Sequence, residues 1–190
     1  ENHDNPDWEI LAHILRHVRQ KIELSFAYIQ YWDVEDVEES RLFARAIHGH
    51  PTITRFDDYR VGGEFPDESL DVLYSALATL PALESIILFG CTQLITPEDK
   101  SAMAHAESLA ELLRVSTLRS VCFDFFVFTP ALCQATAKAL MDGSAITDLE
   151  FKNCSFSEEG SAVMMANGLA GNTSGSHEKV CRLYTSDAAH

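Results

Sequence analysis

Apolar residues recur along this chain in a nine-residue pattern, which is clearest at residues 83–91 and 146–154. In both segments the first, fourth and sixth positions are apolar, and the ninth is a cysteine. Weaker copies begin at Ile53 and Leu118, and a still weaker one lies near Ile22. Because the fourth and sixth positions are two residues apart, their side chains point to the same face of a β-strand. The recurrence predicts an array of repeats with one strand in each.

The segments before these strands have the spacing of helices with one apolar side. Before the strand at residue 83, apolar residues from Leu73 to Leu80 follow the i, i+3, i+4, i+7 spacing. The fourth positions of successive strands are 30, 35 and 28 residues apart, which leaves room for one helix and one strand in each repeat. Residues 8–18 predict a further helix, and Met164 and Met165 of the last helix are expected in the core.

This combination of strand motif, repeat length and helix resembles the ribonuclease-inhibitor type of leucine-rich repeat, over roughly residues 20–172. The resemblance implies a right-handed α/β solenoid, a horseshoe segment with a parallel sheet on its concave side and helices on its convex side. The alternative is an ordinary doubly wound α/β sheet. No glycine-rich phosphate loop follows any of the strands, and this counts against the alternative.

The chain divides into a long array and a short end. We expect residues 1–176 to form one leucine-rich repeat array of about five strand–helix units, the first of them weak. Residues 177–190 are expected to hold a truncated repeat start, at 180–183, and an end that resembles a non-native tail. Neither end shows the polar cap that repeat arrays normally need for solubility. Uncapped ends leave a strand edge exposed, so self-association through them is expected.

Charge and cysteine usage exclude several classes of partner. The net charge of −15 argues against nucleic acid, where affinity depends on lysine and arginine at the phosphates, and against an anionic membrane surface. No apolar run reaches the ~18 residues of a membrane span. The five cysteines are odd in number and follow the repeat rather than a disulfide framework. We therefore expect a reducing, cytoplasmic location.

The sequence offers no strong catalytic or metal-binding pattern. His13 and His17 share a helix face but lack the intervening glutamate of a zinc-protease motif. Cys122 is expected to be the most exposed thiol, yet phenylalanines surround it and no histidine is near it in sequence. We therefore expect a protein that is not an enzyme and that holds no cofactor and no metal.

Alternation within each strand defines the surface that faces the concave side. Three columns are expected there: Arg55, Ser85, Ser120, Asp148; then Asp57, Ile87, Cys122, Glu150; then Tyr59, Phe89, Asp124, Lys152. Aromatic residues beside charges are typical of interface anchors. The candidate partner-binding residues are Arg55, Asp57, Tyr59, Arg60, Phe89, Asp124, Phe125, Glu150 and Lys152, with Tyr59, Phe89 and Phe125 as the strongest anchors.

The resemblance implies a scaffold that binds a protein partner, of unknown identity, through this concave face. Fold alone does not fix function. One alternative is a regulatory repeat segment of a larger protein, such as a ubiquitin-ligase adaptor, a GTPase-activating protein or an immune-type receptor. Another is that the segment has no ligand and that Phe89 lies under a loop.

Overall fold

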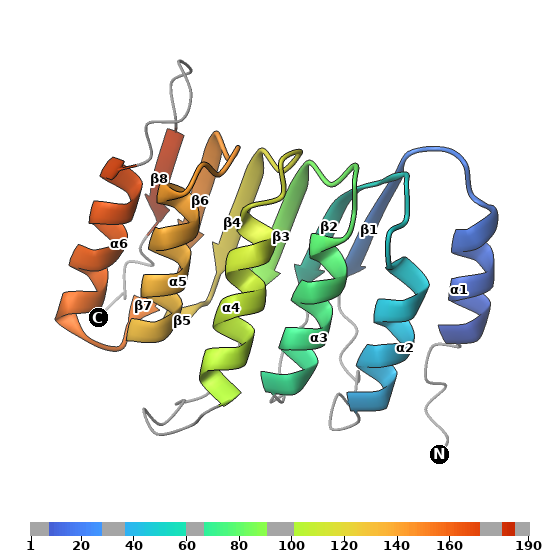
Figure 1. Ribbon diagram of the computed structural model, residues 1–190, viewed down its shortest axis with the longest axis horizontal. Coiled ribbons are helices and arrows are strands. Elements are labelled where there is room, and N and C mark those ends of the chain that lie inside the picture. The colour runs from blue at the N-terminus through green and yellow to red at the C-terminus, as the bar shows by residue number, and fades with distance from the viewer. Residues whose placement is uncertain (1–7, 28–36, 60–66, 91–100, 172–179, 185–190) are drawn as a thin grey trace.

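The computed structural model describes residues 8–27, 37–59, 67–90, 101–171 and 180–184. Helices and strands alternate through these residues (Figure 1). The helices are α1 Trp8–His17, α2 Val37–Ile47, α3 Asp67–Ala78, α4 Ser101–Leu113, α5 Pro130–Met141 and α6 Glu159–Gly171. The strands are β1 Ile22–Ala27, β2 Ile53–Tyr59, β3 Ser85–Phe89, β4 Ser120–Asp124, β5 Val127–Phe128, β6 Asp148–Lys152, β7 Ser155–Phe156 and β8 Val180–Tyr184.

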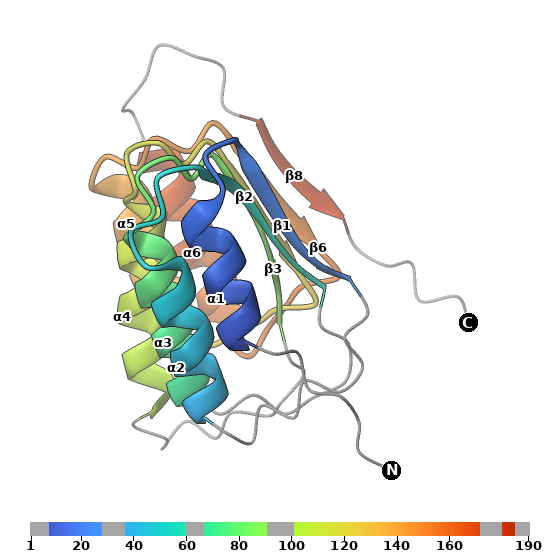
Figure 2. The ribbon, with the colours of Figure 1, turned by 90° about the vertical axis from the view of Figure 1, so that its right-hand side faces the viewer.

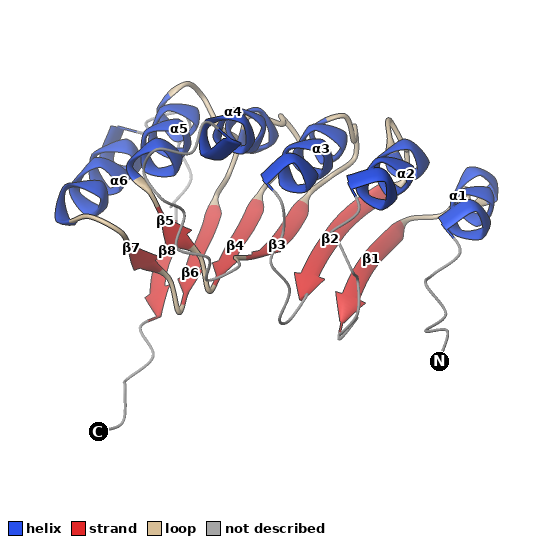
Figure 3. Ribbon diagram, turned by 90° about the horizontal axis from the view of Figure 1, so that it is seen from below, coloured by secondary structure: helices blue, strands red, loops and turns tan. Residues whose placement is uncertain are grey.

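The strands form one layer and the helices another (Figure 2). Six strands make a parallel sheet in the order β1-β2-β3-β4-β6-β8, which is their order along the chain. Viewed along the other axis, the row of helices arches over the row of strands, so the sheet lies on the concave side (Figure 3). The predicted solenoid with a parallel concave sheet is therefore confirmed.

The core consists of rows that run across the sheet from strand to strand. Leu88, Phe123 and Phe151 pair in register, as do Ile86, Val121 and Leu149. All six side chains are buried, and the rings of Phe123 and Phe151 stack with centroids 5.5 Å apart. The rows agree with the sequence pattern because the period of two places the fourth and sixth positions of every repeat on the helix side.

Hydrogen bonds in the segments that connect helices and strands cap the helix α5 and link neighbouring repeats. The N–H of Leu132 donates to Thr129 Oγ1 at 3.3 Å, so Thr129 caps α5 and Pro130 fills its first position. The buried ring of His50 lies with Nε2 2.8 Å from the carbonyl oxygen of Leu15, which ties α1 to the next repeat.

Three details differ from the sequence-based expectations or add to them. The two-residue strands β5 and β7 pair with each other in a small second sheet that the pattern did not predict. Met164 is 37% exposed, whereas Met165 lies in the core as expected. The repeat start expected at 180–183 forms the strand β8, which also includes Tyr184; Leu183 and Tyr184 pair with Phe151 and Lys152. The division at residue 176 stays a prediction.

Candidate functional site on the concave face

The register of the strands aligns the side chains of the concave face in columns. Arg55, Ser85, Ser120 and Asp148 are paired across β2, β3, β4 and β6, and so are Asp57, Ile87, Cys122 and Glu150. Phe89, Asp124 and Lys152 form the third column. The backbone of Tyr59 pairs with Ala27 of β1, while its side chain and all of Arg60 lie outside the described residues. The columns thus follow the alternation expected from the sequence.

Two ion pairs lie on either side of the middle of this face. On β2, Nε of Arg55 donates to both carboxylate oxygens of Asp57, at 2.9 and 2.8 Å. On β6, Nζ of Lys152 lies 2.9 Å from Oε2 of Glu150. The hydrogen bond that Lys152 donates to the carboxylate of Glu150 is the largest cause that raises the pKa of Lys152. Each cation is paired with an acid two residues away on its own strand, so the two charges of each pair largely neutralise each other. The pairs therefore present little net charge to a binding partner.

Apolar side chains occupy the strip between the two ion pairs, on β3 and β4. Cys122 stands between Ile87 and Glu150 and is 5% exposed. The expectation that it is the most exposed thiol is wrong, because Cys154 is less buried among the described cysteines. Burial raises the pKa of Cys122 to about 11, although the ammonium of Lys152 acts in the opposite direction. A thiol that stays protonated at neutral pH is a poor nucleophile.

Two aromatic side chains, one half-buried and one exposed, lie at the end of this apolar strip, where the strands β3 and β4 end. The rings of Phe89 and Phe125 have centroids 5.2 Å apart and are tilted by 38°. Phe89 is half-buried, and Phe125, just after β4, is 43% exposed. The structure therefore places two of the three predicted anchors in contact, with the more exposed ring outermost.

The backbone of Phe125 is unusual for so large a residue. Its φ is +56°, in the left-handed region. Asn153, at the same position of the next repeat, has φ +52°, and asparagine adopts this conformation far more readily. A bulky side chain in the left-handed region is a genuine outlier, which persists only where its surroundings impose it.

The neighbouring backbone shows what imposes this conformation. The N–H of Phe125 donates to the carbonyl of Lys152 at 2.9 Å, and the carbonyl of Phe126 accepts from Ser155 at 2.8 Å. The ring of Phe126 turns inward and packs edge-on against Phe123, with centroids 5.1 Å apart. A Cβ on Gly90 would lie 2.5 Å from Cα of Phe126, so the chains pass closely here. Since Phe126 is directed inward, the ring of Phe125 is left on the surface.

The sequence contained a signal for this geometry that the pattern analysis did not use. The eighth position of the nine-residue motif is Gly90, Phe125 and Asn153 in three successive repeats. Glycine and asparagine at one position indicate a tight or left-handed backbone there. Phe125 is therefore the exception, because a bulky residue occupies a position where the other two repeats have glycine and asparagine.

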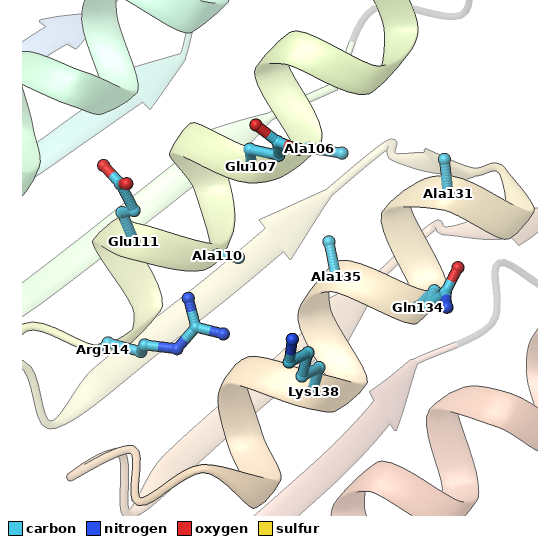
Figure 4. A pocket seen from close by; sticks show the side chains of 9 residues that line it. All are labelled: Ala106, Glu107, Ala110, Glu111, Arg114, Ala131, Gln134, Ala135 and Lys138. Atoms are coloured by element: carbon cyan, nitrogen blue, oxygen red, sulfur yellow. The ribbon is translucent and has the colours of Figure 1, made fainter.

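The convex face has grooves, and they result from the spacing between neighbouring helices. A groove of about 370 Å³ lies between α4 and α5, with Ala110 and Ala135 on its floor and Glu111, Arg114 and Lys138 on its rim (Figure 4). A second, of about 570 Å³, lies between α2 and α3. Their recurrence between neighbouring helices marks a property of the repeat rather than a dedicated site.

Within the described ranges, no group of three or more histidine, cysteine or acidic residues is placed to hold a metal ion. In the same part of the chain, no helix has the length and apolar character needed to cross a membrane.

Comparison with known proteins finds the same fold in solved structures. No protein-family model and no curated protein matches the sequence. The tropomodulin C-terminal domain of Caenorhabditis elegans is similar with a TM-score of 0.57 and 16% identity, over 87% of this chain and 93% of that one. Actin-binding site 2 of leiomodin-1 is similar with a TM-score of 0.57 and 14% identity, over 88% and 90%. At this level of identity the likeness establishes the fold, and it confirms the leucine-rich-repeat architecture.

Proposed function

We propose that this chain, a leucine-rich-repeat solenoid of the ribonuclease-inhibitor type, is a protein-recognition module that binds its partner through the concave face. The aromatic pair of Phe89 and Phe125 is the central anchor. The left-handed backbone of Phe125 is the single observation that carries this proposal. The left-handed backbone costs about 1–2 kcal/mol, and the hydrogen bonds to the next repeat and the inward packing of Phe126 would accommodate asparagine here equally well, so folding alone does not call for a phenylalanine that is 43% exposed.

An exposed and immobilised ring suits binding. Aromatic residues dominate the energetics of interfaces, because they bury a large area and lose few rotamers. The contact between the two rings fixes Phe125 before the partner arrives, which lowers the entropy cost of association. We therefore infer a binding role for Phe125 from its strained backbone and its exposed ring.

The other predicted residues complete the proposed surface as a polar surround. The ion pairs of Arg55 with Asp57 and of Lys152 with Glu150 flank the apolar strip, and Asp124 accepts a hydrogen bond from Asn153 Nδ2 at 3.1 Å. Rim charges of this kind set orientation and association rate more than affinity. Tyr59 is retained in the proposed surface because strand alternation predicts that it faces the concave side, and Arg60 is retained because it follows at the end of that strand.

The chemistry of the face favours binding over catalysis. The described thiols Cys122, Cys133 and Cys154 are free, and burial raises the pKa of each to about 11. They are suited to a reducing compartment, so we place the module inside the cell. The same binding role holds if the array is a regulatory segment of a larger protein.

Actin is the first partner to test, because one of the two similar solved structures is an actin-binding site of leiomodin-1. The shared fold makes this an analogy, since one fold hosts many functions. Fluorescence titration with monomeric actin and co-sedimentation with filaments would measure binding, with Phe125→Asn as the matched variant. We expect the wild-type chain to bind one of the two states and the variant to bind it more weakly.

Absence of binding to both states would exclude actin as the partner. A photoreactive residue placed at Phe125, with one at exposed Glu68 on the convex side as control, would then test the face itself. A protein captured from Glu68 but not from Phe125 would overturn the concave-face proposal.

A further inference from the structure

The carboxylate of Asp124 lies beside the aromatic pair of Phe89 and Phe125. Asp124 pairs with Phe89 in the register of β3 and β4, and it directly precedes Phe125 in the chain. It is half-buried, and its Oδ1 accepts the hydrogen bond from Asn153 Nδ2 at 3.1 Å. A carboxylate can accept hydrogen bonds at both of its oxygens. Asp124 therefore keeps the capacity to bind a further donor.

The cations of this face that the structure describes are paired with other acids. Arg55 is bonded to Asp57, and Lys152 is bonded to Glu150. Lys152 stands next to Asp124 in the register of β4 and β6, but its ammonium lies 2.9 Å from Glu150 instead. Within the described part of the chain, Asp124 is thus an acid next to the two rings that forms no ion pair.

The other charged residues of the face are placed differently. Glu23 and Asp148 lie near the amino-terminal ends of β1 and β6, whereas the rings lie where β3 and β4 end. Arg60 follows the end of β2 and Arg182 lies in β8, and the described residues do not include the side chain of either. What distinguishes Asp124 is therefore its position beside the rings rather than the total charge of the face.

A partner that covers the rings also covers this carboxylate. Removing an ionised carboxylate from water is costly unless a cation or further donors take the place of the water. A purely apolar partner would leave Asp124 with the side-chain amide of Asn153 alone. The faces of phenylalanine rings carry partial negative charge, so they attract a cation. A cationic side chain therefore satisfies the rings and the carboxylate together.

We propose that this site recognises a cationic side chain of the partner, an arginine or a lysine, which lies on the ring of Phe125 and pairs with the carboxylate of Asp124. This recognition presupposes the proposed concave-face function and specifies the chemistry of the partner segment. Ile87 and Cys122 continue the surface away from the rings, so apolar residues beside the cation complete the segment. The net charge of −15 favours the approach of a basic segment.

Peptide selection tests this recognition while the natural partner is unidentified. Random peptides displayed on phage are first depleted on Phe125→Asn and then selected on the wild-type chain, so that the retained peptides need the ring. In synthetic copies of these peptides, arginine is replaced by citrulline, or lysine by acetyl-lysine, which removes the charge. Fluorescence polarisation measures the dissociation constant of each charged and neutral peptide.

Two variants of the chain separate a local contact from general electrostatic attraction. Asp124→Asn removes the charge but keeps a side-chain oxygen for the hydrogen bond from Asn153. Glu107→Gln removes an exposed acid from the convex helix α4 and is the matched control. Circular dichroism confirms that both variants fold.

We expect the retained peptides to be enriched in arginine or lysine, and neutralisation to raise the dissociation constant about 3- to 30-fold on the wild-type chain. The effect should be smaller on Asp124→Asn and the same on Glu107→Gln, and an equal effect on all three chains would overturn the pairing with Asp124. Peptides that need Phe125 but contain no cation, or that bind equally well when neutralised, would overturn the cationic recognition and leave the concave-face function standing. If no retained peptide needs Phe125, the concave-face function fails, and the cationic recognition fails with it.

Discussion

Replacing Phe125 by asparagine separates the cost of its backbone from the value of its ring. Asn153 occupies the same repeat position with nearly the same φ, so asparagine is the residue this backbone already accommodates one repeat later. Phe125→Ala is the informative comparison. Both variants remove the ring, but only alanine retains the full left-handed penalty of an ordinary side chain.

The magnitudes follow from the contacts of the ring. With 43% of the residue exposed, loss of the covered part costs about 1 kcal/mol, and loss of the contact with Phe89 costs about 0.5–1.5 kcal/mol. Relief of the backbone returns about 1 kcal/mol in the asparagine variant. We therefore expect Phe125→Asn to be less stable than the wild type by about 0.5–1.5 kcal/mol, and Phe125→Ala to be less stable than Phe125→Asn by about 1 kcal/mol.

Urea denaturation followed by circular dichroism measures both differences, with the slope of the transition checked for constancy. Asn153→Ala serves as a matched control, because it introduces the same penalty at the equivalent position and removes the hydrogen bond to Asp124. If Phe125→Ala were as stable as Phe125→Asn while Asn153→Ala was clearly destabilised, the inference of strain at Phe125 would be refuted.

Three further predictions concern the array itself. Leu88→Ala, in a fully packed row, should cost about 2–5 kcal/mol in urea unfolding, and a change below 0.5 kcal/mol would contradict the register. Gly168→Ala should cost about 1–3 kcal/mol because its Cβ meets backbone, whereas Gly160→Ala, with open space around it, should be neutral or stabilising; equal effects would contradict the close approach of α6. Burial raises the pKa of Cys133 from 9.0 to about 11, so the stability it contributes is complete below pH 9 and is lost as the pH rises toward 11. The urea midpoint should fall over that interval and fall less in Cys133→Ala, and an identical fall in both chains would count against a buried neutral thiol.

The sequence was sufficient to predict the array because the same pattern of apolar positions occurs in every repeat. Ile86, Val121 and Leu149 recur at one position, and a period of two assigns them to one face without knowledge of the loops. The same alternation placed Phe89 and Asp124 on the concave face. These features depend on local geometry that every strand shares, and so they follow from the pattern.

Features that depend on contacts between repeats were harder to predict. Cys122 lies at a concave position, yet its neighbours Ile87 and Glu150 and the inward curvature leave it 5% exposed. Met164 resembles a core residue in sequence, but it is 37% exposed on α6, whose main contacts among the described elements are with α5 and β7. The left-handed backbone of Phe125 results from hydrogen bonds to the next repeat. The sequence motif describes a single repeat, so it carries no information about contacts between repeats.

The most direct test of the concave-face account is one titration series of actin against three forms of the chain. The forms are the wild type, Phe125→Asn on the concave face and Glu68→Gln on the convex face, where exposed Glu68 pairs with Arg41 at 2.6 Å. Loss of a central aromatic anchor typically costs about 1–3 kcal/mol of binding, and loss of an exposed ion pair costs little. The account predicts a dissociation constant raised about 5- to 150-fold for Phe125→Asn, which stays folded with a stability lowered by about 0.5–1.5 kcal/mol, and a dissociation constant that is unchanged for Glu68→Gln. Weakened binding by Glu68→Gln together with unchanged binding by Phe125→Asn would contradict it.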